Sequence, residues 1–158
     1  DSPARVINVV SGGMYTQRLD CDHLIMPEAE YNGAIAYARA KRALTVLTEL
    51  WSEEWRTKRV VVNSMHPGWA DTPGVQSALP VFRRITQTVL RSSEEGADTI
   101  VWLARAREAA TLSGKLFLDR EPRTTHLRKS TKEPSGARAN LLPWLRSTYA
   151  ALPVEGSS

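Results

Sequence analysis

The sequence predicts an α/β fold in which a parallel sheet is covered by helices on both faces. Short runs rich in β-branched residues alternate along the chain with longer stretches of helical periodicity. The two clearest strand-like runs each stop at a turn that contains glycine or proline. An alternation of strand and helix favours right-handed crossovers, and these join parallel strands. Because 158 residues make about one ordinary domain, we expect a single domain over residues 1–158.

Local patterns predict the first three elements. A β-branched run at residues 5–10 stops at Ser11-Gly12-Gly13, as a buried strand does when it ends in a turn. From residue 33 to about residue 55, apolar side chains recur at spacings of three and four, which predicts a long helix. A second β-branched run at residues 59–65 ends at His66-Pro67-Gly68, where proline can neither continue a helix nor donate to a sheet. We therefore expect strand, helix and strand.

The second half of the chain predicts the same alternation. Ser92 and the glutamate three residues later form a capping box, and apolar residues then repeat at helical spacing up to residue 104. The run at residues 115–118 follows a Ser-Gly turn and predicts a third, shorter strand. Residues 135–151 predict a terminal helix that is interrupted or kinked at Pro143.

The composition excludes several classes of protein. With 42% hydrophobic and 24% charged residues, the chain is neither disordered nor fibrous. It contains no apolar run near the roughly 20 residues that a membrane-spanning helix needs, so we predict no membrane span. Cys21 is the single cysteine and cannot form an internal disulfide, which favours a cytoplasmic protein.

Charge and histidine positions predict neither a nucleic-acid partner nor a metal. The net charge is +4, and six basic residues face two acidic ones between Arg120 and Arg138. A nucleic-acid surface has such an excess, but so does a solvated surface segment, and no zinc or RNA-binding signature accompanies it. His23, His66 and His126 lack metal-ligand spacing, so we expect turn or surface roles for them.

The residues with chemical potential lie at the predicted carboxyl ends of the strands, where such sheets bind ligands. Ser11 follows the first strand. Tyr37 and Lys41 lie four residues apart on the next helix, so their phenol and ammonium groups share one face. A lysine held there, near a cofactor, would favour the phenolate and lower the pKa of Tyr37 from about 10. Tyr37 could then donate or accept a proton near neutral pH.

Each of these features also has a simpler interpretation. A Tyr-x-x-x-Lys pair occurs by chance in about one such chain in eight, and Ser11 before two glycines is usually a turn residue. The segment from Pro67 to Thr72 can likewise be only a turn, although its backbone groups and threonine hydroxyl suit a polar ligand. Coincidence becomes the poorer explanation because all three features occur in order, each at the expected position.

These motifs together resemble the short-chain dehydrogenase/reductase family. The segment RVINVVSGG is similar to the strand that ends in the catalytic serine of the family. YARAK is similar to its Tyr-x-x-x-Lys helix, and HPGWADT to its cofactor loop. The resemblance extends from about Ala4 to Pro122, and it is nearest to the retinol-dehydrogenase-like branch.

The resemblance implies an oxidoreductase that uses NAD or NADP to interconvert an alcohol and a carbonyl. It implies that Ser11 hydrogen-bonds the substrate oxygen, Tyr37 is the general acid and base, and Lys41 holds the nicotinamide ribose and lowers the tyrosine pKa. Hydride transfer is the chemistry of the cofactor, and orientation and proton transfer are the share of the protein. The residues that would line the cofactor besides Tyr37 and Lys41 are Pro67, Gly68, Ala70 and Thr72.

The glycine-rich loop that cradles the pyrophosphate in this family has no counterpart here, because no glycines fall in the Gly-x-x-x-Gly-x-Gly spacing. The resemblance therefore implies the carboxyl-terminal half of a doubly wound, Rossmann-type sheet. We expect a homo-oligomer, or a missing amino-terminal half that completes the sheet. A non-catalytic structural or partner-binding fragment is the alternative. Met14, residues 24–26 and residues 75–82 would border a lipophilic substrate, or they are core and loop residues.

Overall fold

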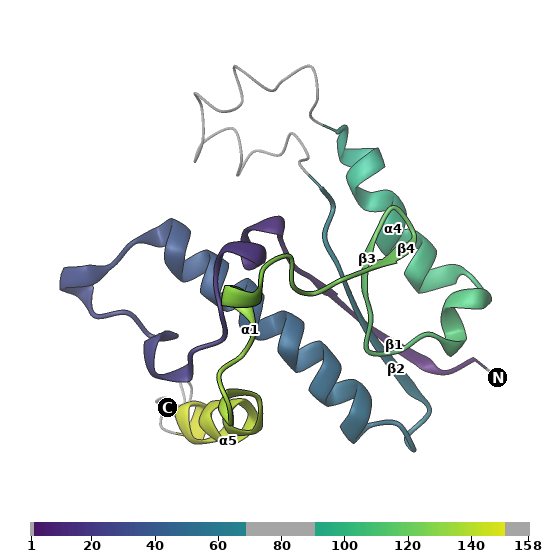
Figure 1. Ribbon diagram of the computed structural model, residues 1–158. Coiled ribbons are helices and arrows are strands. Elements are labelled where there is room, and N and C mark those ends of the chain that lie inside the picture. The colour runs from purple at the N-terminus through teal and green to yellow at the C-terminus, as the bar shows by residue number, and fades with distance from the viewer. Residues whose placement is uncertain (1, 69–90, 151–158) are drawn as a thin grey trace, which may run out of the picture.

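The computed structural model describes residues 2–68 and 91–150 (Figure 1). Its sheet contains β1 (Ala4–Val9), β2 (Val60–Met65), β3 (Leu116–Leu118) and β4 (Glu121–Arg123), in that spatial order. The first three strands are parallel and β4 is antiparallel to β3. The predicted parallel α/β sheet is confirmed.

Two helices cover opposite faces of this sheet: α1 (Gly33–Glu54) and α4 (Ser93–Arg105). Neighbouring residues of a strand point to opposite faces. Ile7 packs into the cluster that contains Leu103 of α4. The next residue, Asn8, donates its side-chain N–H to Thr48 Oγ1 of α1 at 2.9 Å. Helices therefore lie on both faces, as predicted.

The terminal helix α5 (Ala137–Ala150) packs on α1, at the lower left of Figure 1. Leu141 of α5 is fully buried with Leu19 and Leu47. The predicted interruption at Pro143 is wrong, because the helix continues through it. Pro143 is exposed, so the carbonyl that it leaves without an amide partner can be hydrated. No helix within the described ranges is both long and apolar enough to span a bilayer.

Within residues 2–68 and 91–150, six short elements were not predicted from the sequence patterns. Five are single turns of 3-10 helix: η1 (Gly12–Thr16), η2 (Cys21–His23), η3 (Glu28–Glu30), η4 (Glu108–Thr111) and η5 (Lys129–Thr131). The sixth is β4, which is joined to β3 by Asp119 and Arg120, both at positive φ (56° and 59°). Hairpins with a two-residue turn at positive φ usually carry Asn-Gly or Asp-Gly in the turn, which makes them recognisable in a sequence. Here α4 holds the turn instead, since Arg120 bonds Asp98 and its backbone N–H donates to Thr99 Oγ1 at 3.2 Å.

Candidate active site

The carboxyl ends of the three parallel strands meet at one edge of the sheet. Val9 pairs with Met65, and Met65 pairs with Phe117, so the strands end level with one another. The first polar residues of the segments that leave these ends are Ser11, His66 and Asp119. Of the predicted site residues, Ser11, Tyr37, Lys41, Pro67 and Gly68 belong to this region. Ala70, Thr72 and the stretch from residue 75 to residue 82 lie outside the described residues.

Ser11 caps the 3-10 helix η1, which follows β1. Its backbone is extended (φ −142°, ψ 150°), and its Oγ accepts a hydrogen bond from the Gly13 N–H at 3.3 Å. A β-carbon at Gly13 would lie 3.7 Å from the Ser11 Oγ and 3.8 Å from the Ala38 Cβ of α1. These are ordinary van der Waals distances, so η1 packs directly on α1, one residue from Tyr37. The Ser11 hydroxyl accepts in this cap and retains its own proton to donate.

Tyr37 and Lys41 lie together on the first half of α1. The Lys41 Nζ is 5.4 Å from the centroid of the Tyr37 ring, and it donates to the Val9 carbonyl at 2.9 Å. The Tyr37 side chain is 53% exposed, so its hydroxyl is accessible to a ligand. The predicted shared face is present. Since Val9 is two residues before Ser11, the lysine ties this face to the end of β1.

The turn after β2 is formed by His66, Pro67 and Gly68. Gly68 adopts φ +75°, a conformation that favours glycine. Its N–H donates to the His66 Nδ1 at 3.3 Å, so that nitrogen carries no proton. Burial lowers the pKa of His66, and the nearby Arg91 lowers it further, which keeps the ring neutral and able to accept. The surface position that was the other expectation for His66 is wrong, because the residue is only 8% exposed.

Tyr15 supports the His66 ring from η1. The two rings meet edge to face, with centroids 6.2 Å apart. The Tyr15 hydroxyl donates to the Thr124 carbonyl at 2.8 Å, and burial raises the pKa of Tyr15. Tyr15 therefore stays protonated as a hydrogen-bond donor within the scaffold. This contact links the chain after β4 to the segment that carries Ser11.

Arg42 is a buried cation behind the predicted site, and no sequence motif indicated it. It is fully buried, and its Nε donates to the carbonyls of Met14 and Gln17 at 3.1 and 3.0 Å. Its Nη1 donates to the Thr125 carbonyl at 2.7 Å. One guanidinium thus fixes both η1 and the chain after β4 on α1. The sequence carries a weak signal, because Arg42 stands four residues from buried Ala38, on the buried stripe of α1.

We expect Arg42→Ala to lower the free energy of unfolding of the complete gene product that contains residues 1–158 by about 3 kcal/mol. The variant leaves one buried carbonyl, that of Met14, and two part-buried ones without their donor, and it leaves a void at the base of η1. Arg39→Ala is the control, because the Arg39 guanidinium donates to a single carbonyl, that of His23, at an exposed position. Urea unfolding measures both variants. Equal losses for the two would contradict the central place of Arg42.

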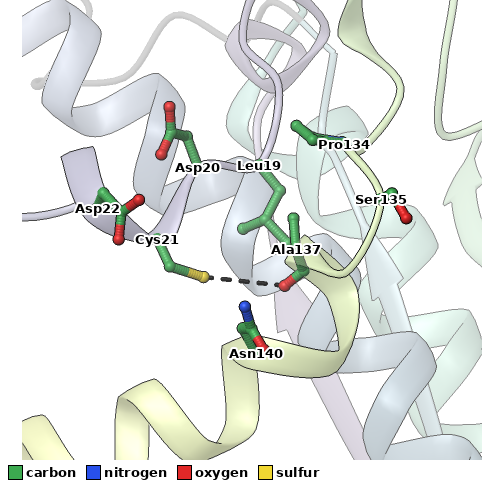
Figure 2. Close-up of a pocket in the computed structure, with 8 residues that line it drawn as sticks. All are labelled: Leu19, Asp20, Cys21, Asp22, Pro134, Ser135, Ala137 and Asn140. Carbon is green, nitrogen blue, oxygen red and sulfur yellow. Dashed lines mark hydrogen bonds between the residues drawn. The ribbon is translucent and has the colours of Figure 1, made fainter.

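A cavity of about 200 Å³ lies away from the strand ends, between η2 and the start of α5 (Figure 2). Cys21 lies at its wall and donates its thiol to the Ala137 carbonyl at 3.8 Å. Burial raises the pKa of the Cys21 thiol, and the neighbouring aspartates raise it further, so the thiol is a poor nucleophile. The residues that line this cavity are Leu19, Asp20, Cys21, Asp22, Pro134, Ser135, Ala137 and Asn140. None of them is a predicted site residue.

No protein-family model matches the chain. It is 44% identical to Dehydrogenase/reductase SDR family member 12 of Homo sapiens over 139 residues, which are 87% of this chain and 43% of that protein. It is 31% identical to Retinol dehydrogenase 13 of Homo sapiens over 73% of this chain and 38% of that protein. The chain thus spans less than half the length of these relatives.

Solved structures share the fold. The crystal structure of angucycline C-6 ketoreductase LanV with bound NADP matches with a TM-score of 0.54 and 21% identity, over 73% of this chain and 42% of that chain. At this level of identity the match concerns the fold alone. It extends the agreement from the sequence to the fold.

Proposed function

Because this chain belongs to the short-chain dehydrogenase/reductase family, we propose that it carries the proton-transfer site of an NAD(P)-dependent oxidoreductase. The reaction would interconvert an alcohol and a carbonyl. The observation that carries the proposal is the position of the Lys41 ammonium, 5.4 Å from the Tyr37 ring centroid and 2.9 Å from the Val9 carbonyl. This arrangement brings an exposed phenol and a cation to the strand end from which Ser11 follows.

In the proposed reduction, the Tyr37 hydroxyl gives its proton to the substrate oxygen, and in alcohol oxidation it takes that proton back. Ser11 donates a hydrogen bond to the same oxygen, since its Oγ accepts from Gly13 and keeps its own proton. Lys41 holds positive charge beside the phenol. These three residues orient the substrate and move a proton, and a bound dinucleotide would supply or accept the hydride.

The described residues fit a dinucleotide at two points. The Lys41 ammonium has three N–H donors and uses one on the Val9 carbonyl, so two are available for ribose hydroxyls. Gly68 has a positive φ and directly follows the carboxyl end of β2, the edge at which such sheets bind ligands. Pro67 and Gly68 would therefore border the nicotinamide, with Ala70 and Thr72 as further proposed contacts. Both NAD and NADP are compatible with these contacts.

A lipophilic substrate remains part of the proposal, with a narrower set of candidate contacts. Met14 is fully buried beside Val10 and Leu116, so it is a core residue. Leu24 packs against the α1–α5 core, whereas Ile25 is 64% exposed. Among the described residues that were expected to border the substrate, Ile25 is therefore the best candidate. The name of the human relative, a retinol dehydrogenase, supports an apolar alcohol or carbonyl as substrate. Homo-oligomer formation and a cytoplasmic location also remain proposals.

The test is turnover by the complete gene product. Aliphatic and aromatic aldehydes and ketones are supplied with NADPH or NADH, and oxidation of the nicotinamide is followed by its absorbance. We expect turnover that depends on both carbonyl and cofactor, with preference for apolar carbonyls. A folded protein that binds neither dinucleotide would favour the alternative, a non-catalytic structural or partner-binding fragment.

The segment between Arg120 and Arg138, which is rich in basic residues, provides a separate prediction against nucleic-acid binding. Arg120 and Arg123 are paired with Asp98 and Glu121, whereas Arg128 and Lys129 are exposed at the start of η5. We expect the double variant Arg128→Glu, Lys129→Glu to keep its oxidoreductase activity within about twofold, because surface substitutions have small effects. Steady-state kinetics measures this. Tight, steeply salt-dependent binding of DNA or RNA that the double variant loses would contradict the proposal.

A further inference from the structure

Arg91 connects three segments at the carboxyl edge of the sheet. It immediately precedes Ser92, the N-cap of α4, and its guanidinium lies against Gly68 in the turn after β2. A β-carbon at Gly68 would be 3.0 Å from the Arg91 Nε and 3.1 Å from its Cζ. Because Gly68 has no side chain, the Arg91 guanidinium can lie in the space that a β-carbon would need.

Asp119 binds this guanidinium in a bidentate ion pair. The Arg91 Nη2 donates to the Asp119 Oδ2 at 2.8 Å, and Nη1 donates to Oδ1. Asp119 directly follows β3 and has φ 56°, so the same residue forms the turn into β4. A bidentate pair restricts the plane of the guanidinium as well as its position. The face of Arg91 that contacts Gly68 is thereby fixed from the end of the neighbouring strand.

A second ion pair provides an internal comparison. Arg120 and Asp98 form a bidentate pair that also joins the β3–β4 turn to α4. Asp98 is about as exposed as Asp119 (44% and 48%), whereas Arg120 is more exposed than Arg91 (54% and 32%). The three heavy atoms nearest to a β-carbon at Gly68 all belong to Arg91. Both ion pairs thus join the β3–β4 hairpin to α4 or its N-terminus. They differ in that Arg91 also lies against Gly68 in the turn after β2.

We infer that Arg91 and Asp119 are positioning residues that hold the Pro67-Gly68 turn in the shape that receives the dinucleotide. This inference rests on the proposed function. The pair acts through Gly68: Asp119 orients the guanidinium, and the guanidinium supports the backbone whose N–H donates to His66 Nδ1. Removing either member of the pair releases the turn, while Ser11 at the start of η1 and Tyr37 and Lys41 on α1 keep their places.

The test compares Arg91→Gln and Asp119→Asn with Arg120→Gln and Asp98→Asn in the complete gene product. We expect the first two variants to raise the KM for NAD(P)H about tenfold with kcat within about twofold, since a displaced contact weakens binding before chemistry. Arg91→Lys should not restore the affinity, because an ammonium lacks the flat, forked shape. The Arg120 and Asp98 variants should stay within about twofold of the unaltered protein. Equal losses in both pairs would reduce the role to general support of the hairpin and overturn the inference.

Asp119→Asn distinguishes positioning from direct contact. If Arg91 instead bound a phosphate of the cofactor, freeing it from Asp119 would strengthen binding, whereas positioning requires that binding weaken. A rise in affinity in this variant would overturn the inference.

Amide hydrogen exchange without cofactor separates this inference from the proposed function. We expect the Gly68 N–H to exchange about tenfold faster in Arg91→Gln and Asp119→Asn, and at the original rate in Arg120→Gln. If the unaltered protein binds no dinucleotide, the proposed function fails, and the exchange rates still show whether the pair holds the turn. Unchanged exchange in all variants would overturn the inference on its own.

Discussion

We expect Tyr37→Phe to lower kcat of the complete gene product about 10²- to 10⁴-fold, the range that a positioned acid or base contributes. The change removes one hydroxyl and leaves the ring beside Lys41. Because the side chain is half-exposed, the free energy of unfolding should change by less than about 0.5 kcal/mol. Affinity for the dinucleotide should be retained. Steady-state kinetics with a carbonyl substrate and urea unfolding measure these quantities.

Lys41→Ala tests the neighbour of the tyrosine. It should raise the KM for the dinucleotide and also lower kcat, because the ammonium is proposed to serve both the ribose and the phenol.

Tyr149→Phe is the control for Tyr37→Phe, since this tyrosine is 80% exposed on α5, away from the strand ends. Its kinetics should match the unaltered protein. A Tyr37→Phe variant that keeps most of its kcat would contradict the assignment of Tyr37 as the proton donor.

The second large effect concerns residues 1–158 on their own. Parallel strands are normally covered on all sides, yet every residue of β1 is at least partly exposed, whereas the last four residues of β2 are buried. β1 pairs with β2 alone among the described residues 2–68 and 91–150. Its other edge therefore offers unpaired backbone groups, and such edges recruit further strands.

We expect this polypeptide to associate in solution or to remain incompletely folded, and to bind NAD(P) weakly. At roughly 25 cal/mol per Å², a few hundred Å² of uncovered apolar surface costs several kcal/mol, comparable with the stability of a whole domain. Analytical ultracentrifugation and a cofactor titration measure the two outcomes. A stable monomer with micromolar affinity for NAD(P) would show the expectation to be wrong.

A single substitution shows whether the β1 edge causes the association. The N–H groups of Ala4 and Val10 donate to carbonyls at the two ends of β2, so the alternating residues 5, 7 and 9 direct theirs outward. Val9→Pro removes one outward donor and leaves the pairing with β2 intact. We expect this variant to sediment as a smaller species than the unaltered chain. The same distribution in both would place the contact elsewhere.

Periodicity along the chain was enough to predict the principal strands and helices. The runs at residues 5–10 and 59–65 became β1 and β2 within one residue at each end, and the apolar spacing from residue 33 became α1. Tyr37 and Lys41 share a face because a spacing of four closes one helical turn, which is a local property. The order of strand and helix likewise predicted that Ser11 and Pro67-Gly68 follow neighbouring strands at one edge.

The sequence by itself determined these local elements and their order, because backbone propensity and side-chain period act over a few residues. The tertiary structure alone decided the contacts between distant segments: Arg42 with Thr125, Arg91 with Asp119, and the burial of His66. These features either join charged or polar groups that are tens of residues apart, or bury such a group under another element. Their partners depend on how the helices pack on the sheet, and no spacing within a single element carries that information.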